Sequence, residues 1–216
     1  MSKIQLRYFR STFVLVLIIH IIFAARSQAC TALAFKRHTD GGIVFAKNFD
    51  FSMGSVTVVE NPAGLARREN GALTWTSKYR TITMNLMWQG QPLPMGGMNE
   101  AGLAIETLYS PDTDYPINGD QPIIDNLAWL QYQLDQYSSV KEVQENLNQF
   151  TITSKYKRHY FGCDHTRCFA LDFRDGNAHF YSDDTLPVWA LTNSLYAVSL
   201  KHLSDSDDAS WQGRAQ

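Results

Sequence analysis

Residues 30–51 have the sequence CTALAFKRHTDGGIVFAKNFDF, which predicts a β-hairpin. Apolar and polar side chains alternate weakly from Thr31 to Lys36, as they do in a half-buried strand. Thr39-Asp40-Gly41-Gly42 is a turn signal, and Ile43 to Phe51 predicts the returning strand. The first predicted element of the chain therefore begins directly after Cys30.

The 29 residues before Cys30 differ from the rest of the chain. A basic start is followed by an apolar run over residues 13–25, and then by the small residues Ser27 and Ala29 at the -3 and -1 positions. This three-part pattern is typical of a secretory signal, and the apolar run is shorter than the roughly 20 residues needed to span a bilayer. The sequence therefore predicts a signal peptide over residues 1–29, export to the periplasm or the outside of the cell, and no stable membrane anchor. An uncleaved anchor is the alternative.

The remaining residues, 30–216, predict one folded domain. The chain of 216 residues is 44% hydrophobic and 19% charged, which is ordinary for a globular protein and argues against disorder. Removal of residues 1–29 leaves 15 basic and 21 acidic residues, a formal charge of -6, so no basic surface for nucleic acid is expected. Without an internal repeat or a Pro- or Gly-rich linker, one domain is the simplest interpretation. Assembly into a homo-oligomer is left open.

The order of the predicted elements is strands, then two helices, then strands again. Ser139 and Glu142 have the spacing of a capping box that starts the second helix. This order favours an α+β domain with antiparallel sheets. The polar tail over residues 204–216 predicts no element. The predicted strands are residues 55–59, 81–88, 102–109, 160–163, 168–173, 178–181 and 188–192, and the predicted helices are residues 123–134 and 140–150.

Three cysteines are an odd number for an exported protein. Cys163 and Cys168 have a spacing that suits a pair bridging a hairpin, and export permits a disulfide. Cys30 is then left free. His159 and His165 lie near the pair in sequence, but no zinc-type spacing is complete, so a metal site is the less favoured alternative.

Cys30 is a candidate nucleophile because cleavage directly before it would expose both a thiol and an α-amino group. A thiol with a pKa of about 8.5 needs a base near neutral pH, and an α-amino group with a pKa of about 7.7 to 8.0 can accept the proton. One N-terminal cysteine therefore supplies the nucleophile and its base. Two alternatives stay open: a buried thiol behind a different cleavage site, and the lipid-modified cysteine of a lipoprotein. The lipoprotein pattern usually has Leu at the -3 position, where this chain has Ser27.

Four motifs in order resemble the choloylglycine hydrolase family, which contains penicillin V acylases and bile salt hydrolases. The resemblance covers nearly all of residues 30–203 and implies an N-terminal nucleophile (Ntn) hydrolase with a four-layer αββα sandwich. It also implies hydrolysis of a linear, non-peptide amide through an acyl-thioester, with no cofactor or metal. The motifs are Cys30-Thr31 with the strand that ends in Asn48, Asp50 and Phe51, then Gly97 to Ala104, the helix segment Trp129 to Val143, and Val188 to Asn193.

The resemblance implies a role for each matching residue. Cys30 would attack the amide carbonyl, and Asp50 would accept a hydrogen bond from its amino group or thiol. The side chain of Asn193 and the backbone N–H of Tyr109 would donate to the oxyanion, which is usually the largest catalytic contribution. Lys47 stands where the family has Arg; it keeps the charge but cannot make a planar bidentate contact, so it implies weaker substrate positioning or thiol activation. A solvated strand residue is the alternative for Lys47.

A second departure from the family concerns the C-terminal part. Family members continue further and place another active-site Arg downstream. No position here matches that Arg, because Arg214 has no motif around it. We therefore expect an Ntn-hydrolase sandwich that is incomplete at its C-terminal end.

The expected partner is a small-molecule acyl amide with a hydrophobic acyl part, such as an N-acyl homoserine lactone, phenoxyacetyl penicillin or a conjugated bile acid. Aromatic residues such as Trp75, Trp88 and Trp129 are candidates for an apolar pocket, although core packing is their default role. Three alternatives stay open: an inactive secreted remnant, a lipid-anchored binding protein, and an acyltransferase of the same superfamily.

Overall fold

The structure is a computed structural model that describes residues 30–50, 55–69, 71, 73–116 and 120–205. The predicted signal peptide over residues 1–29, Phe51 and residues 206–216 of the polar tail lie outside the described residues. The strands are β1 Thr31–Lys36, β2 Ile43–Asn48, β3 Val56–Asn61, β4 Ala66–Glu69, β5 Leu73–Thr76, β6 Thr81–Trp88, β7 Gln91–Asn99, β8 Ala104–Tyr109, β9 Ile123–Asp125, β10 Thr151–Thr153, β11 Arg158–Cys163, β12 Cys168–Arg174, β13 Asn177–Ser182 and β14 Ala190–Leu191. The helices are α2 Asn126–Gln136, α3 Val140–Glu145 and α4 Tyr196–Asp205, with 3₁₀ turns at Leu147–Gln149 and Asp183–Thr185.

Two antiparallel sheets form the centre of the molecule. The large sheet has seven strands in the order β13-β12-β11-β8-β7-β6-β3, and the small sheet has the order β14-β1-β2. The predicted hairpin is present, with Thr31 opposite Asn48 and Lys36 opposite Ile43. Two further pairs, β9 with β10 and β4 with β5, lie outside these sheets.

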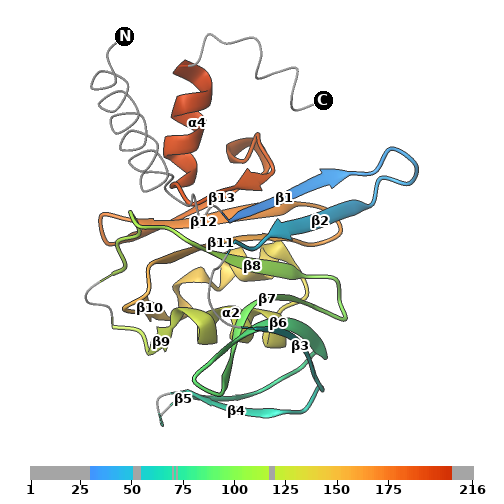
Figure 1. The fold of residues 1–216 in the computed structure, drawn as a ribbon, viewed down its shortest axis with the longest axis vertical. Coiled ribbons are helices and arrows are strands. Elements are labelled where there is room, and N and C mark those ends of the chain that lie inside the picture. The colour runs from blue at the N-terminus through green and yellow to red at the C-terminus, as the bar shows by residue number, and fades with distance from the viewer. Residues whose placement is uncertain (1–29, 51–54, 70, 72, 117–119, 206–216) are drawn as a thin grey trace, which may run out of the picture.

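The large sheet is covered on both faces at β8, β11 and β12. Figure 1 shows β1 and β2 on one side of β8, β11 and β12, and α2 on the other side. Neighbouring residues of β11 therefore enter different cores: Tyr160 packs with Trp129 and Leu130 of α2, whereas Phe161 packs with Cys30 and Ala32. This alternation follows from the two-residue period of a strand and explains why β11 and β12 are almost continuously buried.

The segment Gly97 to Ala104 forms the tight connection between β7 and β8. Asn99 is buried, and its amide donates to the carbonyls of Leu134 and Tyr137 at 2.9 and 2.6 Å. Its side-chain oxygen accepts from Ala101 N and Leu103 N. Because every donor and acceptor of Asn99 is used inside the fold, this residue joins the β7–β8 turn to the end of α2 and has a structural role.

The predicted disulfide is present. Cys163 and Cys168 are cross-strand neighbours in the β11–β12 hairpin and form a disulfide, while Cys30 is a free cysteine. The turn between the two cysteines is organised by Asp164, which accepts from Thr166 N and Arg167 N. The other Asp164 oxygen accepts from Val140 N, the first residue of α3, so the hairpin turn also caps a helix.

Candidate active site

Cys30 lies at the point where the small sheet begins. It directly precedes β1, which pairs with β2 on one side and with β14 on the other. The register sets Thr31 opposite Asn48 and Ala32 opposite Leu191, so Cys30 lies next to the end of β2 that leads to Phe49 and the end of β14 that leads to Asn193. The residue is 7% exposed. Strand pairing therefore brings together the segments that carry two of the sequence-predicted site residues, Cys30 and Asn193.

Asp50 also lies next to Cys30, but through a different atom from the one expected. The Cys30 thiol points to the main-chain carbonyl of Asp50 with an S···O distance of 4.0 Å. The Asp50 carboxylate accepts instead from the Asn48 side-chain amide at 3.1 Å. The thiol therefore contacts the main chain of Asp50, while the carboxylate of the same residue lies at the surface.

Asn193 and Tyr109 meet directly. The Asn193 side-chain amide donates to the Tyr109 carbonyl at 2.6 Å. That contact uses one N–H of the amide, and its oxygen is buried without a hydrogen-bond partner among the described residues. The structure thus brings the two expected oxyanion donors together. The hydrogen bond between them uses the Tyr109 carbonyl, and the Tyr109 side chain is 54% exposed.

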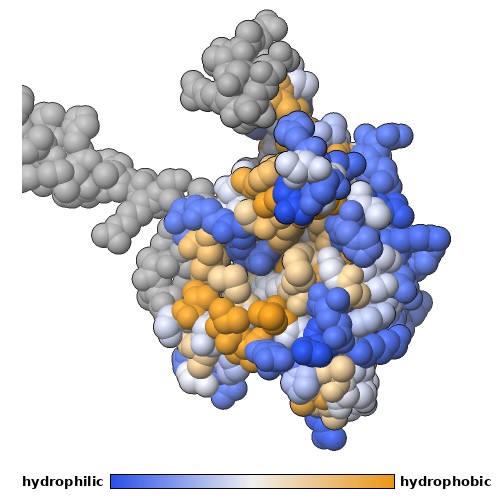
Figure 2. Space-filling model, turned by 90° about the vertical axis from the view of Figure 1, so that its right-hand side faces the viewer, coloured by the Kyte–Doolittle hydropathy of each residue, from blue (hydrophilic) through white to orange (hydrophobic). Residues whose placement is uncertain are grey.

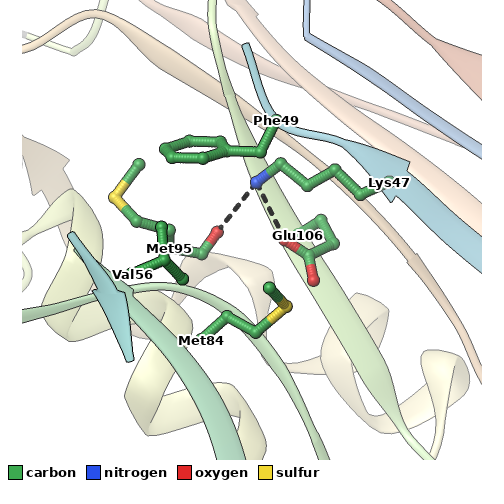
Figure 3. Close-up of a pocket in the computed structure, with 6 residues that line it drawn as sticks. All are labelled: Lys47, Phe49, Val56, Met84, Met95 and Glu106. Atoms are coloured by element: carbon green, nitrogen blue, oxygen red, sulfur yellow. Dashed lines mark hydrogen bonds and ion pairs between the residues drawn. The ribbon is translucent and has the colours of Figure 1, made fainter. Parts of the chain in front are cut away.

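Lys47 is placed differently from the expectation. Its ammonium donates to Glu106 Oε2 at 2.8 Å, to the Thr107 carbonyl at 2.8 Å and to the Met95 carbonyl at 3.3 Å. Figure 3 shows this group beneath the ring of Phe49, 4.9 Å from the ring centre. The side chain is 8% exposed, so Lys47 is not a solvated strand residue. All three N–H donors are occupied within the chain, which leaves none for direct contact with a substrate.

A β-bulge supplies one of these acceptors. The register between β6 and β7 shifts after Met84, with Gly96 opposite Met84 and Pro94 opposite Asn85. Met95 is thereby left without a ladder partner, as is usual at a bulge, and its carbonyl turns to Lys47. Pro94, which has no N–H to give to the ladder, fits this irregular point in an interior strand.

Glu106 is the partner of Lys47 and is itself 7% exposed. Burial raises the pKa of the Glu106 carboxyl, and the charge and hydrogen bond of Lys47 oppose that rise without cancelling it. The pair borders a small pocket whose other walls are apolar (Figure 3), formed by Phe49, Val56, Met84 and Met95.

Several residues near the site were not identified from the sequence. Arg158 is the β11 neighbour of Tyr109. Burial lowers the pKa of the Arg158 guanidinium, while negative charge on nearby groups, Cys30 among them, raises it. An isolated Arg and Glu in predicted strands resemble ordinary surface residues; only strand pairing shows that Arg158 and Glu106 lie beside the site. The adjacent Arg158-His159 pair, at the start of a strongly apolar strand, is the one signal the sequence offers.

No group of three or more His, Cys, Asp or Glu side chains that could hold a metal ion occurs within the described ranges. In the same part of the chain, none of the helices is both long enough and apolar enough to cross a bilayer.

Comparison with known proteins identifies amide hydrolases as relatives. The sequence profile of the linear amide C–N hydrolases, choloylglycine hydrolase family, matches residues 30–172. A penicillin V acylase from Pectobacterium atrosepticum is 28% identical over 144 residues, which cover 61% of this chain and 38% of that protein.

Solved structures agree with this result. A penicillin V acylase from Agrobacterium tumefaciens has a TM-score of 0.70 at 25% identity and covers 80% of this chain and 55% of its own. A single-residue variant of a conjugated bile acid hydrolase from Clostridium perfringens has a TM-score of 0.70 at 20% identity, covering 82% of this chain and 58% of its own. The predicted fold class, an α+β Ntn-hydrolase sandwich, is thereby confirmed. The chain spans 38% of the length of the curated relative and little more than half of each solved structure.

Proposed function

Because the chain belongs to the choloylglycine hydrolase family of linear amide C–N hydrolases, we propose that it hydrolyses a linear amide with Cys30 as the nucleophile. The observation that supports the proposal is the strand register, in which Cys30 precedes β1 between the end of β14 that leads to Asn193 and the end of β2 that leads to Asp50. Three separate segments, which carry a thiol, an amide donor and a carboxylate, thus meet at the start of β1. Such convergence is what nucleophilic catalysis requires.

The reaction begins once cleavage before Cys30 frees its amino group. The amine accepts the thiol proton, and the sulfur attacks the amide carbonyl carbon. The resulting oxyanion receives hydrogen bonds from the second N–H of the Asn193 amide and from the backbone N–H of Tyr109. The C–N bond then breaks, the leaving amine takes up the proton, and the acyl group remains on Cys30 as a thioester. Water attacks the thioester, giving the carboxylic acid and restoring the thiol.

The remaining predicted residues have supporting roles. The Asp50 carboxylate orients the new amino group, since it belongs to the residue whose carbonyl the Cys30 thiol contacts, and it is held by Asn48. Lys47 acts indirectly, by fixing β2 to β7 and β8 through Met95, Glu106 and Thr107.

The substrate is a small acyl amide with an apolar acyl part. This choice is supported by the pocket beside Lys47, whose walls include Phe49, Val56, Met84 and Met95. Phe49 directly precedes the residue whose carbonyl contacts the Cys30 thiol, so an acyl chain bound to Cys30 would lie close to these side chains. Export through the signal peptide would deliver the enzyme to the periplasm or the medium, where such amides are encountered.

The proposal is tested on the full chain expressed with its leader. Intact mass and N-terminal sequencing of the exported protein should show Cys30 as the first residue, unmodified. The purified protein should release amine from penicillin V, a glycine-conjugated bile acid or an N-acyl homoserine lactone. Cys30→Ala should lower kcat by at least about 10³-fold, because the acyl-enzyme can no longer form. Insertion of one Gly between Ala29 and Cys30 is the matched control, since it keeps the thiol and displaces the amine.

Each other outcome points to a different function. A diacylglycerol on Cys30 would indicate that the protein is lipid-anchored and that Cys30 is not the nucleophile. Turnover that survives in Cys30→Ala would refute the nucleophile. Preferential formation of a hydroxamate when hydroxylamine is added, in place of free acid, would indicate an acyltransferase.

A further inference from the structure

A buried histidine–aspartate pair lies beside the loop that carries Asn193. His159 in β11 is 0% exposed and Asp172 in β12 is 1% exposed. The Nδ1 atom of His159 lies 2.9 Å from Asp172 Oδ1. The proposed hydrolysis gives neither residue a direct part, because both are enclosed by the large sheet and the elements packed on it.

The pair holds the Asn193 loop at two points. His159 Nε2 lies 2.7 Å from the carbonyl of Thr192, the residue directly before Asn193. The second Asp172 oxygen accepts from Tyr196 N at 2.5 Å, three residues after Asn193. Tyr196 begins α4, where a negative side chain is favoured by the helix dipole. One ion-pair unit therefore fixes both ends of the loop over residues 192–196.

The protons of the pair follow from its acceptors. The Thr192 carbonyl can only accept, so His159 Nε2 carries a proton. Nδ1 of His159 and Oδ1 of Asp172 are joined by the 2.9 Å hydrogen bond. Each contact of the pair to the loop is made, so its buried polar atoms have hydrogen-bond partners.

The same strand also fixes the other oxyanion donor. In β11, His159 is opposite Leu108 and Arg158 is opposite Tyr109, so β8 is held in register by the strand that carries the histidine. The Asn193 amide in turn bonds the Tyr109 carbonyl. A shift of residues 192–196 would thus change the position of the Asn193 amide relative to Cys30 without moving β1.

We propose that His159 and Asp172 are positioning residues that hold Asn193 at the distance required for oxyanion binding. This inference rests on the proposed function, because it presumes that Asn193 donates to the oxyanion. Removing an oxyanion donor outright costs about 10²- to 10³-fold in kcat, so a misplaced donor should cost somewhat less. His159→Phe and Asp172→Leu should each lower kcat by about 10- to 100-fold and change KM little, since the contact is made in the transition state.

Asp172→Asn is the conservative variant that separates positioning from charge. Its amide oxygen can accept from Tyr196 N, and its amide nitrogen can donate to Nδ1 of a neutral His159. The proton on Nε2 then still serves Thr192, so every bond to the loop is kept and most of kcat should be retained. Asp135→Asn is the matched control, because Asp135 is equally buried in α2 and bonded to Arg67, Trp75 and Gln131, far from the loop in the hydrogen-bond network.

The second measurement is amide hydrogen exchange of residues 192–196 in the exported full-length chain, with Asp135→Asn as reference. His159→Phe should speed exchange of the Tyr196 amide by about tenfold or more, reporting local opening of the loop. The inference is overturned if kcat falls no further than in Asp135→Asn, if Asp172→Asn is as impaired as Asp172→Leu, or if loop exchange is unchanged. If the wild type hydrolyses no amide, the proposed function fails, and the exchange result alone decides whether the pair holds the loop.

Discussion

Lys47 has contacts that the sequence did not predict. The family resemblance places an Arg there, yet the ammonium of Lys47 is fully engaged by Glu106 and two carbonyls. The family resemblance assigned Cys30 and Asn193 to one site, and the pairing of β1 with β14 is compatible with that prediction. The sequence was insufficient for Lys47, since its acceptors come from β7 and β8, and one of them exists only because of a bulge.

Lys47→Met should destabilise the fold by about 3 to 5 kcal/mol, because it leaves the Glu106 carboxylate buried without its partner. Burial holds the Glu106 pKa above its ordinary value, so protonation relieves the penalty. The stability gap to wild type should therefore widen as pH rises through the raised folded pKa of Glu106, which lies above the ordinary glutamate value of about 4.3. Urea unfolding across this range measures the gap. The double variant Lys47→Met with Glu106→Leu should recover most of the loss, and a double variant no more stable than the single one would contradict the ion-pair argument.

At the scale of elements, the strands with β-branched and aromatic residues were predicted well. β1 and β6 occur with the predicted bounds. β7 was not predicted because it contains two prolines and two glycines, which disfavour an interior strand; the bulge accommodates them. Residues 123–125 form β9 and not the start of a helix, since Asp125 is the N-cap of α2.

The last helix was also not predicted. α4 begins at Tyr196, and the carboxylate that caps its first N–H is Asp172, in β12. A cap supplied from a distant strand leaves no local capping signal in the sequence. The Ser139–Glu142 capping box was predicted because both residues are local, and Ser139 does accept from Glu142 N.

The turn of the β11–β12 hairpin supports α3 through Asp164. Burial alone would raise the pKa of Asp164, but hydrogen bonds from Thr166, Val140 and Arg167 lower it below its ordinary value. Asp164→Ala should cost about 1 to 2 kcal/mol through loss of the cap. A lowered folded pKa means that this contribution is complete above the unfolded aspartate value of about 3.9 and is lost as pH falls further. Denaturant unfolding from neutral to acid pH should show the wild-type advantage shrinking only in strong acid, whereas a gap that grew on acidification would refute the assignment.

At the scale of the whole molecule, the small sheet covers only part of the large one. Large apolar side chains of β3, β6 and β7 remain exposed, among them Val58 at 68% and Ile82 at 54%. Figure 2 shows apolar surface gathered on the lower part of this face, at the height of these strands in Figure 1. Among the described strands, β2 pairs only with β1, so an open edge lies near the same face.

An exposed apolar sheet surface of this kind promotes self-association. We expect the protein to associate increasingly with concentration, and Val58→Lys and Ile82→Lys to reduce that association without lowering thermal stability. Sedimentation velocity over a concentration series measures it. Val198→Lys, at a 41% exposed position on α4, is the matched control and should leave the association unchanged. A wild-type chain that stays monomeric throughout the concentration series would show that this surface does not cause self-association.

The start of β1 has a consequence for maturation. Strand pairing begins at Thr31, so the hairpin is complete whether or not the bond before Cys30 has been cut. A leader peptidase that cut one residue early would release a protein with the same hairpin pairing and the same fold. Under the proposed chemistry such a protein would nevertheless be inactive, because the Cys30 amine would be part of a peptide bond with the extra residue. The accuracy of cleavage before Cys30 would then set the fraction of exported molecules that are catalytically active, because folding does not depend on the cleavage site.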